Sequence, residues 1–410
     1  MSESAVPSAP PADAAAAVRF VYAPELAQWR LADDHPFKPV RLELLRDLLE
    51  SWDLLRPEEV LAPAPLRSGE LGRVHDEDYL RMVARVSRGD RPPEAYAYGL
   101  GTHDTPVADG LHDAVERVCA ATATAVEAVL NGTARRAASF AGGLHHAMPG
   151  RASGFCIYDD LAVAILRATD RGLRVAYLDL DAHHGDGVQH AFYERADVLT
   201  VSLHESGRYL FPGTGHSYEL GTGEGRGFSV NLPLEPFTED ESYLRGFDLV
   251  AAPTVRAFEP DLIVLQAGAD VHRDDPLADL ALSLRGMRAV YDRVVALADE
   301  LCDGRLVATG GGGYDAFGVA PLAWAQLWSA MTGRPAPART PPAWRSRWSE
   351  TAGRPLRVEA LDGPDDVDPQ PRRLLVQSHN EAVARRLRKV LEPIWEEHDA
   401  VRRGPSPEGA

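Results

Sequence analysis

The sequence predicts an α/β fold in which a mostly parallel sheet is covered by helices on both faces. Two observations support this prediction. Short strand-like segments alternate with segments of helical length along most of the chain, a pattern typical of parallel sheets with helical crossovers. Polar clusters also follow directly after several predicted strands. Because ligands bind beyond the carboxyl ends of the strands in such sheets, these clusters predict one shared site at that edge.

The predicted strands are short and rich in β-branched, aromatic and aliphatic residues. They span residues 19–22, 137–140, 175–180, 198–203, 228–232, 261–266 and 306–309. The predicted helices show apolar periodicity or end at stop signals. They span residues 41–55, 77–88, 111–130, 160–171, 188–195, 239–258, 284–302 and 381–401. Residues 91–109 are predicted to form a long loop of the kind that is usually functional, and residues 333–371 are predicted to be irregular.

The composition is that of a globular protein with an acidic balance. The chain has 410 residues, 45% of them hydrophobic, and a formal net charge of −18 at pH 7. This charge argues against nucleic acid as a direct partner and would suit a cationic substrate. No apolar run approaches the roughly 18 residues that span a membrane, and the three cysteines are too scattered for a disulfide framework. We therefore expect a cytoplasmic protein that binds neither nucleic acid nor membranes, with a disordered leader over residues 1–17 that lacks the features of a signal peptide.

The stretch from residue 174 to residue 187 reads RVAYLDLDAHHGDG and carries the densest group of ionisable side chains. It begins as a buried strand and then places Asp179, Asp181, His183, His184 and Asp186 within eight positions. Charged side chains are rarely buried unless they are paired or bind a metal. Alternate residues of an extended chain share a face, so we expect Asp179, Asp181 and His183 to point the same way.

A catalytic metal site explains this density best. Two carboxylates and one imidazole, from Asp181, His183 and the strand-terminal Asp270, can hold a zinc-like ion and leave positions open for a substrate. Fe²⁺ or Mn²⁺ would also accept these ligands. The alternative is that Asp179 and Asp181 cap a turn or a helix start, which Asp270 and two further polar clusters disfavour.

The two further clusters are a histidine pair and a tyrosine. His145 and His146 follow two glycines at a strand end, where Asp179 and Asp186 are available to tune their pKa values. Tyr314 follows four consecutive glycines, and a phenol there could donate to a carbonyl oxygen as negative charge develops on it. The alternatives are a solvated histidine pair and a plain glycine-rich turn. Phosphate binding is disfavoured because the glycine run lacks the spacing and the lysine of a nucleotide-binding loop.

Taken together, these motifs resemble those of the zinc-dependent histone deacetylase family over roughly residues 18–333. They are similar to its class I branch and to the bacterial acetoin-utilisation-type deacetylases. The motifs are His145-His146, Asp179-x-Asp181-x-His183-His184-Gly185-Asp186-Gly187, Phe211-Pro212-Gly213-Thr214-Gly215, Gly268-Ala269-Asp270 and Gly310 to Tyr314. The resemblance implies an arginase-like three-layer fold with a central sheet of about eight strands. It also implies a catalytic domain over residues 18–333, with residues 334–410 as a Pro/Arg-rich segment and helix that pack on or extend it.

The resemblance further implies hydrolysis of an acyl amide, typically acetyl-lysine, and a role for each site residue. The implied zinc ligands are Asp181, His183 and Asp270. The implied catalytic residues are His145, His146 and Tyr314, with Asp179 and Asp186 as partners of the histidines. The implied substrate contacts are Gly154, Phe155 and Phe211 in a tunnel and Asp104 and Leu277 at its rim, with Arg41 in an internal acetate channel. The implied structural site for K⁺ or Na⁺ consists of Asp179, Asp181, His183, Ser202 and Leu203.

In the implied mechanism, His146 is the general base and then the general acid, His145 is mainly electrostatic, and Tyr314 and the metal stabilise the oxyanion. The main alternative is an acetylpolyamine or other small-molecule deacetylase. Such relatives tend to carry Asn where Asp186 stands, so Asp186 favours a protein-lysine substrate. An arginase-type enzyme is disfavoured because its two metals need more carboxylates, and an inactive module would lack a zinc ligand or the tyrosine. Asp315 departs from the family, many members of which carry Asn after the tyrosine.

Overall fold

The computed structural model describes residues 17–29, 31, 32, 34–363 and 373–403, so the expected leader lies outside the described residues except for Ala17. Eight strands form one sheet in the order β2-β1-β3-β8-β7-β4-β5-β6, and every neighbouring pair is parallel. The strands are β1 (Val18–Val21), β2 (Val60–Leu61), β3 (Arg136–Ser139), β4 (Val175–Asp179), β5 (Val198–Glu205), β6 (Ser229–Leu234), β7 (Leu262–Gln266) and β8 (Leu306–Thr309). The predicted α/β class with a parallel sheet of eight strands is confirmed.

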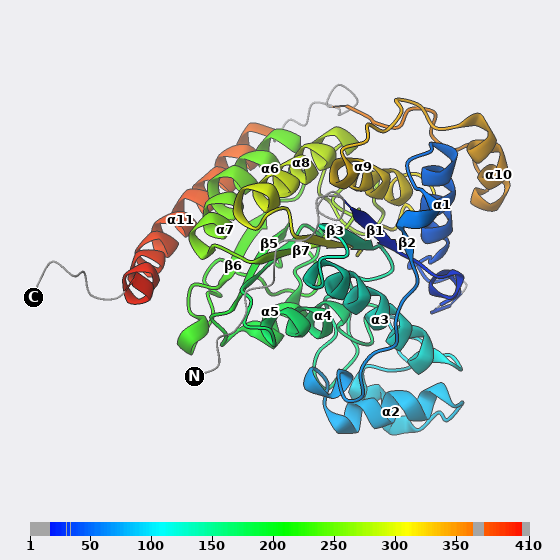
Figure 1. Cartoon of the computed structure of the whole chain (residues 1–410), viewed down its shortest axis with the longest axis horizontal. Coiled ribbons are helices and arrows are strands. Elements are labelled where there is room, and N and C mark those ends of the chain that lie inside the picture. Colours follow the sequence, from blue (N-terminus) through cyan, green and yellow to red (C-terminus); the bar gives the residue numbers. More distant parts are fainter. Residues whose placement is uncertain (1–16, 30, 33, 364–372, 404–410) are drawn as a thin grey trace, which may run out of the picture.

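Helices cover both faces of the sheet and make it the middle of three layers (Figure 1). They are α1 (Val40–Ser51), α2 (Glu77–Ser87), α3 (Leu111–Leu130), α4 (Asp160–Thr169), α5 (Asp186–Phe192), α6 (Asp240–Gly246), α7 (Ala252–Phe258), α8 (Leu284–Leu301), α9 (Ala320–Thr332), α10 (Pro342–Ala352) and α11 (Arg373–Arg403). In Figure 1, α3, α4 and α5 lie below the sheet, and α6 to α9 with α11 lie above it. Among the described helices, none is long and apolar enough to cross a membrane.

Several elements differ from the predictions for local reasons. The helix expected over residues 239–258 is interrupted by a π-helical turn, Phe247–Ala251, just before Pro253; the wider turn accommodates a proline ring that would clash with a regular helix. The sequence does not predict α9, because this helix is apolar and buried on all sides and shows no amphipathic period. The irregular structure expected for residues 333–371 is wrong at α10, where Pro342 occupies the first turn and fits a helix. The strand β2 was missed because two residues show no alternation.

The C-terminal helices pack on the rest of the molecule. α10 lies against α1, where the Trp344 indole donates to Leu44 O at 3.1 Å. α11 begins at Arg373, earlier than predicted. Its Asn380 accepts the Glu235 N–H at 3.0 Å and lies beside α6 and β6. These contacts do not divide the chain into units, so the boundary at residue 333 stays a prediction.

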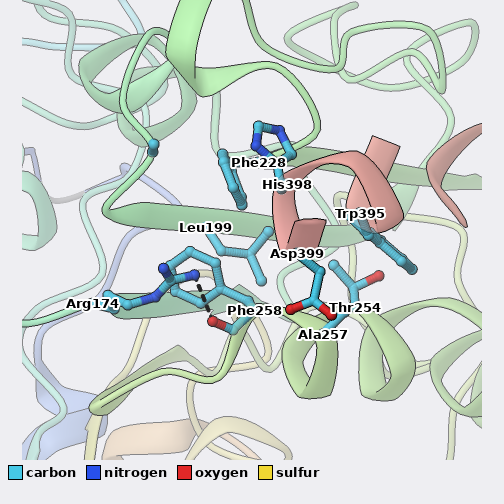
Figure 2. A pocket seen from close by; sticks show the side chains of 10 residues that line it. Arg174, Leu199, Phe228, Thr254, Ala257, Phe258, Trp395, His398 and Asp399 are labelled. Atoms are coloured by element: carbon cyan, nitrogen blue, oxygen red, sulfur yellow. Dashed lines mark hydrogen bonds between the residues drawn. The ribbon is translucent and has the colours of Figure 1, made fainter. Parts of the chain in front are cut away.

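α11 also closes a pocket at the edge of the sheet opposite the predicted site (Figure 2). It is lined by Arg174, Ala196, Leu199, Phe228, Thr254, Ala257, Phe258, Trp395, His398 and Asp399. Arg174, Ala196 and Phe228 precede β4, β5 and β6, so the pocket lies at the amino ends of these strands. None of its lining residues belongs to the predicted catalytic site.

The strand register brings the carboxyl ends of four central strands, β3, β8, β7 and β4, into one row, which continues at Ser202 within β5. Ser139, Thr309, Gln266, Asp179 and Ser202 are successive Cα partners across β3, β8, β7, β4 and β5. The loops that follow the first four of these residues therefore leave the sheet side by side. They are the loops in which the sequence places the histidine pair, the glycine run and both parts of the metal site.

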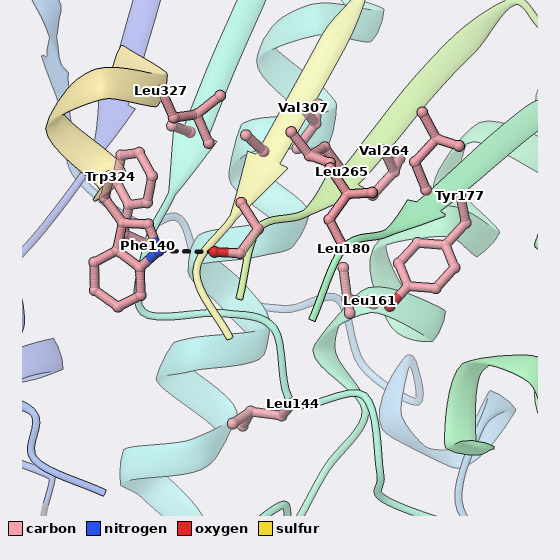
Figure 3. Close-up of a cluster of buried hydrophobic side chains, with 14 of the residues drawn as sticks. Phe140, Leu144, Leu161, Tyr177, Leu180, Val264, Leu265, Val307, Trp324 and Leu327 are labelled. Atoms are coloured by element: carbon pink, nitrogen blue, oxygen red, sulfur yellow. Dashed lines mark hydrogen bonds between the residues drawn. The ribbon is translucent and has the colours of Figure 1, made fainter. Parts of the chain in front are cut away.

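A buried apolar core supports these loops from behind (Figure 3). Trp324 of α9 stacks on Phe140, the residue directly after β3, with ring centroids 5.6 Å apart. Its indole N–H donates to Ala267 O at 2.8 Å, directly after β7. A buried indole usually finds such a partner. α9 thus fixes the first residues of the loops after β3 and β7.

Candidate metal centre and active site

Three of the predicted ligands come together from two loops. β4 ends at Asp179 and β7 at Gln266, and the loops beyond them carry Asp181, His183 and Asp270. The ligand atoms of these last three residues, here called the metal cluster, all lie within 4.8 Å of one another and are buried. His183 Nδ1 lies 2.9 Å from Asp270 Oδ2 and 3.2 Å from Asp181 Oδ1.

Of the three residues expected to point the same way, Asp181 and His183 do so, and the expectation is wrong for Asp179. The strand stops at Asp179, so the two-residue period of an extended chain does not continue through the next four positions. Asp179 instead contacts His145, while Asp181 and His183 turn toward Asp270.

The metal cluster fits a divalent cation. Asp181 and Asp270 are buried side by side, and burial together with the charge of Asp181 raises the pKa of Asp270 to about 8. The Asp181 carboxylate also accepts neutral donors, Gln266 Nε2 at 2.8 Å and Gly312 N at 2.7 Å. Two adjacent buried carboxylates are costly without a positive charge that both can share. Their combination with an imidazole suits zinc and Fe²⁺.

The glycine run lets the backbone approach the metal cluster more closely than a side chain would allow. A Cβ at Gly312 would lie 1.9 Å from Asp270 Oδ2, and a Cβ at Gly311 would lie 2.2 Å from Gln266 Nε2. Gly311 also has a φ of 131°, which favours glycine. The run therefore ends with Tyr314 beside the cluster, its ring centroid 6.3 Å from that of His183.

The histidine pair lies next to the metal cluster, and one carboxylate holds each ring. His145 Nδ1 lies 2.8 Å from Asp179 Oδ2, and His146 Nδ1 lies 2.7 Å from Asp186 Oδ1. When Nδ1–H donates to the carboxylate, Nε2 of each ring is available to contact a substrate, a water molecule or a proton. His145 Nε2 lies 3.9 Å from Asp181 Oδ1, which places it at the cluster.

The two histidines differ in pKa. Burial disfavours the charged form of His145, but the carboxylates of Asp179 and Asp181 outweigh burial and raise its pKa to about 9. Burial and the charge of His145 lower the pKa of His146 to about 4. At neutral pH His146 is therefore the neutral ring, with a lone pair that can accept a proton. A cation on Asp181 would offset part of the attraction that keeps His145 charged.

A buried carboxylate at the start of α4 fixes the loop before the histidine pair. Asp160 accepts the N–H groups of Gly143 at 3.1 Å and Leu144 at 2.7 Å, and the hydroxyl of Thr122 at 2.5 Å. Sequence reasoning missed this residue. Its place beside Asp159, at a helix start, was a visible signal for capping but not for these distant partners.

Tyr314 is held from both sides. Its N–H donates to Asp275 Oδ2 at 2.7 Å, and Arg41 Nη1 donates to Gly313 O at 3.0 Å. Burial and the nearby carboxylates raise the pKa of the phenol well above its usual value, so the hydroxyl remains a donor. No sequence pattern pointed to Asp275, which also accepts the Leu277 N–H at 2.9 Å.

Arg41, predicted for an internal channel, is buried against two rings. Its guanidinium carbon lies 4.5 Å from the centroid of Phe37 and 4.8 Å from that of Trp324. One cavity is lined by Phe37, the histidine pair and Tyr314, and a second by Phe37 and Arg41. Because Phe37 lines both, the cavities are neighbours, and Arg41 lines only the second; the internal channel stays a prediction.

The predicted tunnel residues flank the approach to the metal cluster. Phe211 packs against His146 with ring centroids 5.0 Å apart, and Phe155 packs against Tyr314 at 5.7 Å. Gly154 packs closely against the His146 and Phe211 rings, because a Cβ there would lie 2.4 Å from the first ring and 2.8 Å from the second. Phe211 is 44% exposed, so this wall extends to the surface.

The two predicted rim residues are exposed. The carbonyl of Asp104 accepts His35 Nε2–H at 3.1 Å, and the His35 ring packs on Phe155 at 4.4 Å. Leu277 is tied through its N–H to Asp275. His35 and Asp275 therefore connect the rim to the tunnel and to the tyrosine loop, and sequence reasoning missed both.

The residues expected to hold a monovalent cation lie at the end of β4, in the loop after it and within the neighbouring strand β5. They are Asp179, Asp181, His183, Ser202 and Leu203. Asp179 and Ser202 are Cα partners across β4 and β5. The Ser202 hydroxyl lies 2.8 Å from His204 Nδ1. The cation itself stays a prediction.

His184, which had no role in the sequence analysis, anchors the loop that carries Phe211. Its Nδ1 lies 2.8 Å from Thr214 Oγ1, and the neighbouring His204 donates through Nε2 to Gly215 O at 2.9 Å. The two rings lie 4.9 Å apart. The sequence placed His184 in the motif but did not show which segment it contacts.

Comparison with known proteins identifies the family. Residues 35–331 match the histone deacetylase domain. The chain is 44% identical to the acetoin utilization protein AcuC of Bacillus subtilis (strain 168) over 316 residues, which cover 77% of this chain and 82% of that protein. It is 40% identical to AcuC of Staphylococcus aureus (strain MRSA252), with coverage of 77% and 82%. A crystal structure of an HDAC homolog from Aquifex aeolicus matches with a TM-score of 0.78 and 28% identity, covering 91% of this chain and 100% of that chain; the HDAC homolog complexed with SAHA gives the same values.

The three-layer parallel sheet and the buried carboxylate–histidine cluster at its strand ends define a metal-dependent hydrolase fold and site. The chain belongs to the histone deacetylase family, in its bacterial acetoin-utilisation-type branch. It is therefore a deacetylase of a metal-dependent family.

Proposed function

We propose that this deacetylase removes acetyl or other short acyl groups from the ε-amine of lysine side chains in proteins. The observation that carries the proposal is the metal cluster beside the histidine pair and Tyr314, flanked by the rings of Phe155 and Phe211. Two aromatic walls suit the apolar stem of a lysine, whose charge the acyl group has removed.

The proposed metal is zinc, held by Asp181, His183 and Asp270, with Fe²⁺ as the alternative in the cell. When bound, the ion would polarise the acyl carbonyl and lower the pKa of a water molecule. A structural K⁺ or Na⁺ is proposed at the five residues named above, around the end of β4 and within β5.

His146 is the proposed general base and then the general acid. Its lowered pKa keeps the ring neutral at neutral pH, and Asp186 holds the proton on Nδ1. Nε2 can then accept a proton from the attacking water and deliver it to the departing lysine amine. His145, whose pKa Asp179 raises, contributes mainly positive charge near the reacting carbonyl.

Tyr314 is the proposed donor to the acyl oxygen. Its phenol stays protonated, and contacts of its own N–H and of the preceding carbonyl hold its backbone. A donor fixed in advance stabilises negative charge on the oxygen more strongly in the transition state than in the substrate.

The remaining site residues would bind substrate and product. Asp104 can accept N–H groups of the substrate backbone, and Leu277 offers an apolar contact at the rim. Gly154 leaves room beside the acyl-lysine stem. Arg41 is a buried cation toward which a released acetate ion would be drawn.

Protein lysine is preferred as substrate over a small acetylated amine such as an acetylpolyamine. The exposed Phe211 and Leu277 and the rim carboxylate of Asp104 offer contacts to residues on either side of an acetyl-lysine, and Asp186 stands where polyamine-type relatives tend to have Asn. The net charge of −18 keeps the cationic polyamine as the second candidate. An inactive regulatory module is the third, although every expected ligand is present.

Residues 18–333 are the proposed catalytic domain, and the cytoplasm is the proposed compartment. The three cysteines, Cys119, Cys156 and Cys302, are all buried free thiols, as suits a reducing environment.

Turnover of matched substrates tests the proposal. The zinc-loaded protein is assayed with an acetyl-lysine peptide, the same peptide carrying longer acyl groups, and acetylspermidine. We expect the highest kcat/KM for the acetyl-lysine peptide. A higher value for acetylspermidine would assign the chain to small-molecule substrates, and no amine release from any of them would favour the inactive module.

A further inference from the structure

We infer that residues 353–363, here called the C-terminal strap, position the two loops that carry Tyr314 and Asp270. The inference rests on the proposed deacetylation. The strap follows α10 and lies beyond residues 35–331, which match the family domain. Its charged side chains nevertheless reach both loops of the active site.

The first contact holds the turn after Tyr314. The Asp315 carboxylate, mostly buried, forms an ion pair with Arg354 of the strap and also accepts the Gly318 N–H at 2.9 Å. An asparagine at this position would keep the bond to Gly318 but would lose the ion pair. The negative charge of Asp315 is therefore matched to the strap.

The second contact holds the loop after the metal ligand Asp270. Asp362 of the strap is a buried acceptor for three groups of this region and for Arg357 of the strap itself, and its pKa is lowered because its partners outweigh its burial. They are His272 Nε2 at 2.9 Å, Arg273 Nη2 at 2.7 Å, Arg357 Nη1 at 3.1 Å and the Leu284 N–H at 2.6 Å. His272 is fully buried and lies two residues after the proposed ligand Asp270, so its bond to Asp362 fixes the position of this loop relative to the strap.

The loop that carries Tyr314 and the loop that carries Asp270 are also joined to each other. Arg357 pairs with Asp274 as well as with Asp362. The next residue, Asp275, accepts the N–H of Tyr314 at 2.7 Å. The strap therefore contacts two joined loops, one carrying the proposed oxyanion donor Tyr314 and the other the proposed metal ligand Asp270.

The glycine run explains why Tyr314 needs contacts from outside its own loop to hold its position. Residues 310–313 have no side chains with which to pack, so the place of Tyr314 depends on contacts made by its neighbours. A displacement of about 1 Å in a catalytic group is enough to reduce the rate strongly. The Arg354 and Arg357 side chains are 54% and 28% exposed, and ion pairs of partly exposed arginines add little to stability. Loss of the strap contacts should therefore reduce kcat more than it reduces folding.

The test uses the full-length, zinc-loaded protein and compares Arg354 with an arginine of similar exposure, together with Arg357, whose side chain is 28% exposed. Arg354→Gln and Arg357→Gln each remove a strap contact. Arg347→Gln is the control, because Arg347 lies on α10 and pairs with Asp47, away from the site, at 2.6 Å; its side chain is 51% exposed and that of Arg354 is 54% exposed. kcat and KM for the acetyl-lysine peptide, the melting temperature and backbone hydrogen exchange are measured for each variant.

We expect kcat to fall about threefold in each strap variant, with KM and melting temperature unchanged. Exchange should become faster in residues 310–318 for Arg354→Gln and in residues 271–277 for Arg357→Gln. The control should keep the wild-type kcat, and Arg354→Lys should recover most of the kcat lost in Arg354→Gln. Asp315→Asn should lower kcat as much as Arg354→Gln does, and the double variant of Asp315→Asn with Arg354→Gln should show no further loss. Strap variants that match the control in kcat and in exchange would overturn the inference. Because exchange needs no substrate, it tests the strap even if the wild type fails to deacetylate the peptide, which would refute only the proposed function.

Discussion

Replacement of Tyr314 by phenylalanine removes one hydroxyl from the active site and leaves the backbone that positions it unchanged. The bonds from the Tyr314 N–H to Asp275 and from Arg41 to Gly313 O involve no atom of the phenol. The aromatic contact with Phe155, at 5.7 Å, also remains. The substitution therefore tests the proposed donor with little effect on the fold.

The loss of one preorganised oxyanion donor costs about 100- to 1,000-fold in kcat, or roughly 3–4 kcal/mol of transition-state stabilisation. The hydroxyl acts mainly on charge that develops during the reaction, so KM should change less than about threefold. Its raised pKa means that the phenol donates across the neutral pH range, and the defect should not be rescued by a change of pH.

The assay is steady-state release of amine from an acetyl-lysine peptide by zinc-loaded protein. Tyr291→Phe is the matched control, because the Tyr291 hydroxyl on α8 is buried and has no hydrogen-bond partner among the described residues. The control should keep the wild-type kcat. A kcat for Tyr314→Phe within about fivefold of the wild type would refute the proposed role.

Three further predictions concern stability and the metal. His75 is buried and neutral, and burial lowers its pKa to about 4 from 6.5. As pH falls, the unfolded chain binds the proton first, so about 3 kcal/mol of unfolding free energy should be lost between pH 6.5 and pH 4. Urea unfolding over this pH range should show a smaller loss for His75→Gln than for the wild type. Glu70 and Arg167 form a buried two-point ion pair at 2.8 and 2.6 Å, so Glu70→Gln should cost about 3–5 kcal/mol of unfolding free energy, and a cost below about 1 kcal/mol would contradict this. Zinc should raise the melting temperature of the wild type but not of Asp270→Asn, and an equal shift in both would show that the ion binds elsewhere.

The sequence predicts that the proposed catalytic residues lie at one edge of the sheet, and the structure places them there because of their positions along the chain. Each cluster lies within a few residues of a strand end, as His145 does after β3 and Asp181 after β4. Parallel strands bring these ends to one edge, so local sequence and one topological rule were enough to gather the site. Where the chain left the regular strand, as it does after Asp179, the same local reasoning placed side chains wrongly.

The residues that sequence reasoning missed act through distant partners. Asp160 reaches the loop before the histidines, His35 links the rim to Phe155, and Asp275 joins Leu277 to the tyrosine loop. Each is an ordinary polar residue in an ordinary pattern, and its importance depends on which segment folds against it. A helix such as α9 was missed for a related reason, because burial on every side removes the amphipathic period.

Metal-dependent turnover tests the central claim most directly. The wild-type protein is stripped with a chelator and titrated with zinc while amine release from the acetyl-lysine peptide is followed. We predict that activity disappears on stripping, returns with one equivalent of zinc and does not return in Asp181→Asn. Turnover that survives complete removal of metal, or that is restored equally in Asp181→Asn, would contradict the claim that Asp181, His183 and Asp270 hold the catalytic ion.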